Sequence, residues 1–261
     1  TGSIIASLLA LGKSVKEILA IYNEHVPTVM KESGNEHRTA ALASLAQSVY
    51  GDASFTDMKT FVGIVATRWM EERPMIFKTS PDQAHGGESS FSPGFGVPVR
   101  DAVQASCSAI PFFKSKTVTT DKGETIELID GGFCANNPTL YAIADATHAL
   151  KKDHEELRVV SLGVGTYPPR QLPFWTWNYW KSKTPGVKIA HKTFEINTQS
   201  MEQLRKLLFK DVPTVRINQE FAEPAMATDM FEYDLAKLNL LLQRGSQSYA
   251  EHEPKLKEYL L

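Results

Sequence analysis

Apolar residues recur at helical spacing from the first residues of the chain onward. The apolar run 4–11 ends at Gly12, and Ser14 with Glu17 three residues later forms the pattern of a capping box for a second helix through about residue 30. Further helices are predicted over residues 39–50, 99–109 and 139–152, the last of them preceded by Asn137 as the N-cap and Pro138 at the first helical position. Short apolar runs predict strands over residues 61–67, 75–78, 124–129 and 157–162.

The order of these elements favours a layered α/β fold. Strand, glycine turn, helix and strand follow one another after residue 124, which is typical of a mainly parallel sheet covered by helices. With 261 residues, 42% of them hydrophobic, the chain can bury one substantial core, so we expect a single domain over residues 1–261. Residues 81–98 are rich in Gly, Ser and Pro and predict a long loop.

Composition narrows the choice of partners and compartment. Lys and Arg number 28 against 30 Asp and Glu, so the net charge of -2 gives no reason to expect DNA or RNA. Two cysteines favour a reducing cytoplasm over a secreted disulfide scaffold. The run 4–11 is too short to span a bilayer, so we expect a soluble protein that reaches the inner membrane only from its surface.

Asp130, Gly131 and Gly132 are the strongest candidates for chemistry. They follow an apolar strand and precede a helix, where open α/β sheets place ligand-handling groups. Two glycines allow a sharp turn and a close approach of substrate or another segment to the carboxylate. An ordinary turn aspartate that caps the next helix is an equally good interpretation of this tripeptide alone.

Thr1 and Gly2 match the last two positions of a nucleophile elbow, G-x-S-x-G, that runs into its helix. Ser3 is then a helix residue, and the nucleophilic serine would stand immediately before Thr1. The alternative is a chain that begins Thr-Gly-Ser by chance.

The ordered set of motifs resembles the patatin-like phospholipase family. In that family the elbow helix comes first, a D-G-G/A motif like 130–132 follows later, and Asn136-Asn137-Pro138 stands after the glycines. Further similarities lie at residues 72–77, 103–111 and, more loosely, at a closing helix over 228–245.

The resemblance implies a three-layer patatin-like fold and a Ser-Asp dyad in which Asp130 activates the serine without an intervening histidine. It implies hydrolysis of the carboxylic esters of membrane phospholipids, with no metal or organic cofactor. The family's first strand, glycine-rich oxyanion loop and nucleophile would all precede Thr1. Within the family, the chain is most similar to bacterial antiphage effectors that a cyclic di- or trinucleotide activates, and a homo-oligomer is compatible with this.

Several alternatives and secondary sites remain open at this point. A Ser-His-Asp triad would need His148 or His154, and a non-catalytic lipid- or nucleotide-binding module or a purely structural partner could retain the fold. The aromatic run 174–180 suits either a membrane interface or a buried cluster, and the turn 163–166 could expose amides to a phosphate. Basic residues in loop-like segments could hold an anionic activator: Lys114, Lys116, Arg170, Lys181 and Lys183.

Overall fold

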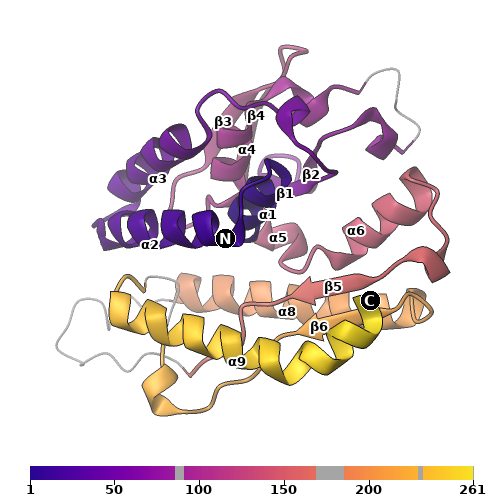
Figure 1. Ribbon diagram of the computed structural model, residues 1–261. Helices are drawn as coiled ribbons and strands as arrows, with labels where there is room; N and C mark the ends of the chain where they lie inside the picture. Colours follow the sequence, from indigo (N-terminus) through magenta and orange to yellow (C-terminus); the bar gives the residue numbers. More distant parts are fainter. Residues whose placement is uncertain (86–90, 169–184, 229–231, 261) are drawn as a thin grey trace.

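The computed structural model of the protein describes residues 1–85, 91–168, 185–228 and 232–260 (Figure 1). A group of helices forms one side of its amino-terminal part: α1 (Gly2–Ala10), α2 (Val15–Lys31), α3 (Asn35–Tyr50) and α4 (Val99–Ser106). The predicted capping box is present at the start of α2, where Ser14 accepts a hydrogen bond from the Glu17 N–H and the Glu17 carboxylate accepts one from the Ser14 N–H. Helix α3 begins four residues earlier than predicted.

Four strands form the larger sheet: β1 (Gly63–Arg68), β2 (Arg73–Lys78), β3 (Lys116–Thr119) and β4 (Thr125–Asp130). Their order is β2-β1-β4-β3, and every neighbouring pair is antiparallel. The register pairs Ala66 of β1 with Asp130, the last residue of β4. The sheet therefore places Asp130 beside the middle of its central strand β1.

The expectation of a mainly parallel central sheet is wrong for these four strands. Residues 69–72 join β1 to β2, and residues 120–124 join β3 to β4. Connections this short can only reverse the chain, whereas a parallel pair needs a crossover of a dozen residues or more. Parallel pairing occurs between β5 (Val159–Leu162) and β6 (Thr214–Ile217), which form a separate two-stranded sheet.

The main core lies between the larger sheet and helices α1 and α4. Its fully buried members include Leu8, Ala66, Phe77, Val103 and Leu128. These side chains come from both helices and from the three strands β1, β2 and β4, so their burial fixes α1 against the sheet.

The rest of the chain packs around β5 and β6. Asp130 is followed by α5 (Gly132–Ala135) and α6 (Thr139–Ala144), and a π-helical turn (Asp145–Ala149) ends the helix that was predicted to reach residue 152. Two long helices, α8 (Pro185–Leu208) and α9 (Leu235–Leu260), lie alongside the two-stranded sheet in Figure 1. Short 3-10 turns occupy Phe55–Asp57, Pro81–Gln83, Pro93–Gly96, His154–Glu156 and Pro224–Met226.

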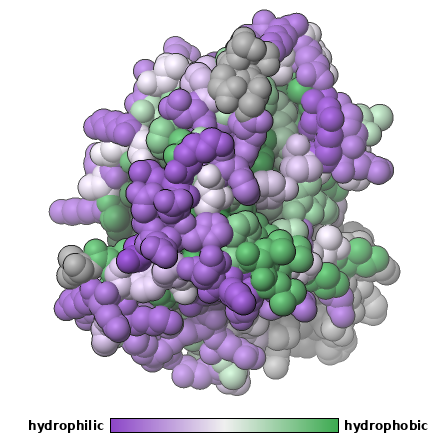
Figure 2. Space-filling model, turned by 90° about the vertical axis from the view of Figure 1, so that its right-hand side faces the viewer, coloured by the Kyte–Doolittle hydropathy of each residue, from purple (hydrophilic) through white to green (hydrophobic). Residues whose placement is uncertain are grey.

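Part of the apolar surface remains exposed. Figure 2 shows apolar residues gathered near the middle of one face, between hydrophilic areas. Leu162 at the end of β5 and Val164 just after it are about three quarters exposed, although parallel strands usually bury both faces. None of the described helices combines the length and the apolar character needed to cross a bilayer.

Candidate active site around Asp130

The backbone of Asp130 is held from two sides. Its N–H donates to the Ser108 carbonyl oxygen at 3.0 Å, and its own carbonyl oxygen accepts from the Thr67 hydroxyl at 2.9 Å. Ser108 follows α4, and Thr67 belongs to β1. Asp130 is therefore fixed at the strand end by two elements that the core also holds.

Gly131 is required for space and not for a special backbone conformation. Its φ and ψ are -66° and -18°, which any residue adopts. A Cβ atom at Gly131 would lie 2.1 Å from the Val65 carbonyl oxygen, so only glycine lets the chain pass this close to β1. A segment does approach closely here, but it is strand β1, and it approaches the backbone of Gly131 and not the carboxylate.

Gly132 supplies the hydrogen bond that orients the carboxylate. Its backbone N–H donates to Asp130 Oδ1 at 2.6 Å, and a Cβ atom at this position would lie 2.9 Å from the same oxygen. Gly132 is also the first residue of α5, so the hydrogen bond joins the strand end to the helix start. The N-cap of α5 is Gly131 and not Asp130, as the alternative interpretation proposed, and the hydrogen bond from Gly132 leaves the second Asp130 carboxylate oxygen uncommitted within the described residues.

The Asp130 carboxyl group is half-buried and weakly stabilised as an anion. Burial raises its pKa above the ordinary value for aspartate, while the hydrogen bond from the Gly132 N–H acts in the opposite direction. Among the described residues, no side-chain donor lies within hydrogen-bond distance of this carboxylate. A carboxylate in this state can accept a proton more readily than an exposed aspartate does.

Helix α1 begins at Thr1 and Gly2, close to the end of strand β4. Thr1 is the N-cap without a side-chain capping bond, and Gly2 is the first helical residue, with no atom within 4 Å of a Cβ built on it. The backbone nitrogen of Thr1 lies 3.9 Å from Cys107 Sγ, and the next residue, Ser108, accepts the hydrogen bond from the Asp130 N–H, so the start of α1 and the end of β4 meet at the end of α4. Ser3 Oγ lies 3.6 Å from Cys107 Sγ and is turned toward the end of α4, as expected of a helix residue.

Helix α8 braces the segment behind the site, which the sequence interpretation missed. Asn197 accepts a hydrogen bond from the Asn136 N–H at 3.0 Å and donates one to the Cys134 carbonyl oxygen at 2.8 Å. The Phe133 and Phe194 rings pack edge to face with centroids 4.8 Å apart. Residues 194–198 of α8 thus contact three of the first five residues after Gly131, although the paired residues are 61 to 63 positions apart in the sequence.

Asn137 and Pro138 lie one position away from their predicted places. Pro138 is the N-cap of α6, and Thr139 is its first residue. The Asn137 side-chain oxygen nevertheless accepts from both the N–H and the hydroxyl of Thr139, at 3.3 and 2.6 Å. The prediction of Asn137 as the N-cap and Pro138 as the first helical residue is therefore wrong by one position, although the Asn137 side chain still accepts from the first helical residue.

Of the two histidines considered for a triad, one is exposed and the other contacts a carboxylate. His148 lies exposed in the π-helical turn, and His154 Nδ1 lies 2.6 Å from the Asp211 carboxylate. Over the described ranges, no group of three His, Cys, Asp or Glu side chains could hold a metal ion.

The candidate anion-binding residues are only partly covered by the structure. Lys114 forms an ion pair with Glu36 and Lys116 forms one with Asp101, so both charges are already balanced. Arg170, Lys181, Lys183 and the aromatic run 174–180 lie outside the described residues, as do residues 86–90 of the predicted loop.

Comparison with known proteins identifies the family to which this chain belongs. The family model described as "Patatin-like phospholipase" matches residues 1–143, which include α1 and the Asp130 motif. The chain therefore belongs to the patatin-like phospholipase family, and the expectation of a patatin-like lipid acyl hydrolase is confirmed.

Individual relatives narrow the comparison within the family. The chain is 56% identical over 261 residues to the "cUMP-AMP-activated phospholipase" of Escherichia coli, which covers all of this chain and 81% of that protein. It is 27% identical over 182 residues to "Patatin-like protein 3" of Arabidopsis thaliana, covering 58% of this chain and 41% of that protein. It is also 22% identical over 258 residues to "Probable inactive patatin-3-Kuras 1" of Solanum tuberosum, covering 89% of this chain and 67% of that protein.

Proposed function

We propose that the protein hydrolyses the acyl esters of membrane phospholipids with Asp130 as the base of a Ser-Asp dyad, and that a cyclic nucleotide switches this activity on. The nucleophilic serine is the residue that precedes Thr1 in the longer protein. The observation that carries the dyad is the position of Asp130, whose half-buried carboxylate lies beside the start of α1 with one oxygen uncommitted within the described residues.

The reaction follows from this placement. As the serine oxygen attacks the ester carbonyl carbon, Asp130 takes the hydroxyl proton, and the carbonyl oxygen becomes an oxyanion. The oxyanion collapses, the bond to the alcohol of the glycerol backbone breaks, and Asp130 returns the proton to that alcohol. Water then attacks the acyl-serine while Asp130 takes a proton from it, the bond to the serine oxygen breaks, the serine oxygen takes back that proton, and the free fatty acid is released.

The start of α1 supports the same mechanism electrostatically. Thr1 offers no side-chain cap, so the backbone N–H groups of the first turn have no acceptor from that side chain. A nine-residue helix carries a partial positive charge at this end, which stabilises negative charge that develops on the preceding residue. Further oxyanion donors would come from the segment before Thr1.

Activation by a cyclic nucleotide is proposed from the relative whose printed name states it. The identity of 56% over the whole chain supports the same mode of activation for this chain. The ligand proposed for this chain is therefore a cyclic dinucleotide of uridine and adenosine. An antiphage context, attack on the cell's own inner membrane and assembly into a homo-oligomer are parts of the same proposal.

The test uses the longer protein that includes the residues before Thr1. Fatty-acid release from phosphatidylglycerol and phosphatidylethanolamine vesicles is measured with cUMP-AMP, with 3',3'-cyclic di-GMP and without a nucleotide. We expect release with cUMP-AMP, none after Asp130→Asn, and none after alanine replaces the serine before Thr1. The cyclic di-GMP arm controls for non-specific anion effects.

Three results would contradict parts of this proposal. Undiminished release by a folded Asp130→Asn variant would exclude the dyad. Equal release in all three nucleotide arms would exclude nucleotide activation while keeping the hydrolase. Lipid binding without any release would favour a non-catalytic module.

A further inference from the structure

The dipeptide Cys107-Ser108 lies at the end of α4, between the two halves of the proposed dyad. The Cys107 sulfur lies 3.6 Å from Ser3 Oγ and 3.9 Å from the Thr1 backbone nitrogen, so it contacts the first turn of α1 twice. The Ser108 carbonyl oxygen accepts the hydrogen bond from the Asp130 N–H at 3.0 Å. Two adjacent residues therefore hold the segment that follows the nucleophile and the strand end that carries the base.

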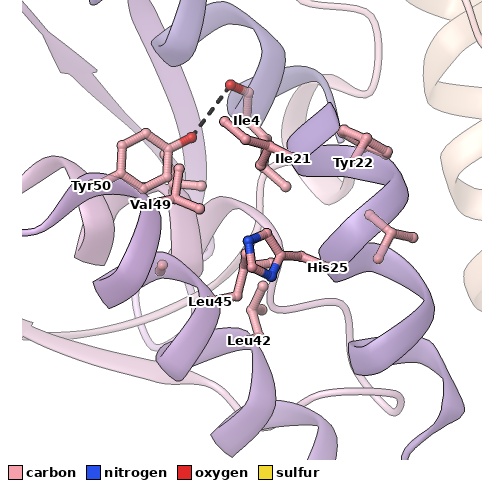
Figure 3. A pocket seen from close by; sticks show the side chains of 11 residues that line it. Ile4, Ile21, Tyr22, His25, Leu42, Leu45, Val49 and Tyr50 are labelled. Atoms are coloured by element: carbon pink, nitrogen blue, oxygen red, sulfur yellow. Dashed lines mark hydrogen bonds between the residues drawn. The ribbon is translucent and has the colours of Figure 1, made fainter. Parts of the chain in front are cut away.

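The first turn of α1 depends on Cys107 more than the rest of the helix does. Thr1 makes no side-chain capping bond, and within the described ranges only Cys107 forms side-chain hydrogen bonds with Thr1 or Ser3. One residue later, Tyr50 of α3 holds the helix, because its hydroxyl donates to the Ile4 carbonyl oxygen at 3.3 Å (Figure 3). Loss of the Cys107 contacts would thus loosen the turn next to the nucleophile while the body of α1 stays in place.

Ser108 gives this contact a rigid base. It is fully buried, its hydroxyl donates to the Gln104 carbonyl oxygen at 2.8 Å, and its N–H donates to the Ala105 carbonyl oxygen at 3.1 Å. Cys107 itself packs against both the main core and the second apolar cluster, which contains Phe112. The end of α4 is therefore fixed on several sides, and the contacts that it makes with α1 and with β4 share one rigid support.

Cys134 lies on the other side of Asp130 and serves as a comparison. The Thr67 hydroxyl has one hydrogen to donate, and it lies 2.9 Å from the Asp130 carbonyl oxygen and 3.2 Å from Cys134 Sγ. Cys134 thus competes with Asp130 for that hydrogen, and among the described residues it forms no hydrogen bond with α1. Both thiols are half-buried. They differ in which half of the site they contact.

We propose that Cys107 is a positioning residue for acyl transfer, whose thiol holds the first turn of α1 so that the serine before Thr1 stays within reach of Asp130. The inference rests on the proposed function. Proton transfer requires the serine oxygen and the carboxylate to lie roughly 2.6 to 3.2 Å apart, and a small misplacement lowers the rate steeply. The thiol itself takes no part in the bonds that form or break.

Cysteine variants of the longer protein test this assignment, with kcat and KM measured on p-nitrophenyl butyrate in the presence of cUMP-AMP. Cys107→Ala should lower kcat about tenfold and leave KM within about twofold, because it alters the geometry of proton transfer and no contact with the substrate. Cys107→Ser should restore kcat to within about threefold of the parent, because a hydroxyl can again hydrogen-bond to Ser3. Cys134→Ala is the matched control and should keep kcat within about twofold, because it leaves the Thr67 hydrogen to Asp130.

The same contact is tested from the side of α1. Ser3→Ala should lower kcat about fivefold, because it removes the stronger of the two contacts made by the Cys107 sulfur. The double variant Ser3→Ala/Cys107→Ala should be no slower than Cys107→Ala alone, since both changes remove one shared interaction. Effects that multiply in the double variant would mean that the two residues act independently.

The outcomes separate this inference from the function on which it rests. If the parent protein hydrolyses no ester, the proposed function fails and the inference fails with it. If the parent is active and both alanine variants of the cysteines lose the same activity, or Cys107→Ser is as slow as Cys107→Ala, then Cys107 only fills space. Thermal unfolding checks the fold of each variant. If Cys107→Ala does not fold, Ser3→Ala decides the matter, and an unchanged kcat there would overturn the inference.

Discussion

Asp130 and Asp145 are both half-buried aspartates, yet their surroundings are opposite in character. Asp145 accepts hydrogen bonds from Lys78 Nζ at 2.6 Å, His85 Nε2 at 2.7 Å and Gln83 Nε2 at 3.2 Å. These donors all belong to the segment 78–85, so Asp145 ties that segment to the end of α6. Asp130 receives one backbone N–H, and no described side chain balances its charge.

The difference distinguishes a structural carboxylate from one suited to chemistry. Surrounding a carboxylate with a lysine and two other donors stabilises its charged form and makes it a poor proton acceptor. Leaving a carboxylate desolvated and nearly unpartnered costs stability, and such groups concentrate at functional sites. Replacing each of these two aspartates by asparagine therefore gives matched variants, whose activity and stability can be compared.

The largest expected effect is on catalysis. Asp130→Asn in the longer protein should lower kcat for phospholipid hydrolysis by about four orders of magnitude, because the amide cannot accept the serine proton. Asp145→Asn should change kcat by less than about tenfold, since the side-chain partners of Asp145 are Lys78, Gln83 and His85 and none of them holds Asp130. Fatty-acid release under saturating activator measures both. Similar losses in the two variants would mean that Asp130 acts through the fold alone.

Second in size is a packing effect at Gly131. A methyl group there would meet the Val65 carbonyl oxygen at 2.1 Å, and neither backbone can yield, so Gly131→Ala should lower the free energy of unfolding by about 3 kcal/mol. Gly245→Ala is the control, because Gly245 is exposed within α9 with no atom near its Cβ position, and it should gain about 0.5 to 1 kcal/mol. Urea denaturation would compare them, and equal shifts in the two would disprove the close approach.

Sequence reasoning was most successful where the signal is local. The capping box at Ser14, the strand that ends at Asp130 and the glycines after it depend on neighbouring residues, and each is present in the structure. Gly131 shows the limit of this approach, because its purpose is contact with Val65, 66 positions earlier. A dihedral argument from the Asp-Gly pair alone could not have identified that contact.

The errors have equally specific causes. The parallel sheet was inferred from the order of elements after residue 124, but strand β3, with only Val118 buried, carries too weak an apolar pattern to be noticed. Without β3, the tight turn that makes β4 antiparallel was invisible. Helix α8 was missed although apolar residues recur at helical spacing over 185–208, and its contact through Asn197 depends on tertiary structure that no local pattern shows.

A third prediction concerns the stability that Asp145 provides. Its ion pair with Lys78 is largely buried, with side chains 14% and 12% exposed, so Asp145→Asn should leave the lysine uncompensated and cost about 3 kcal/mol of unfolding free energy. Asp52→Asn is the control, because Asp52 pairs with Arg100 while 93% exposed, and the change there should stay within about 0.5 kcal/mol. If the Asp145→Asn protein is as stable as the parent, Asp145 does not stabilise the fold, and the contrast with Asp130 fails.

The smallest effect is the stability change at Asp130 and its dependence on pH. Burial raises the pKa of this carboxyl group in the folded protein, so ionisation is harder there than in the unfolded chain, where the pKa is about 3.9. Below that pH both states are protonated and the group makes no difference. As pH rises through the unfolded and then the folded pKa, the unfolded chain loses its proton first, and Asp130 comes to destabilise the fold.

Asp130→Asn removes this penalty and keeps an oxygen that can accept from the Gly132 N–H. The variant should therefore be slightly more stable than the parent at pH 7, and the two should become equally stable near pH 3. Asp145→Asn should do the reverse at pH 7, because it removes a carboxylate that three donors hold. Chemical denaturation at both pH values measures the difference. A parent that is more stable than Asp130→Asn at neutral pH would show that the Asp130 carboxylate contributes to the fold in the way Asp145 does, and the contrast between them would fail.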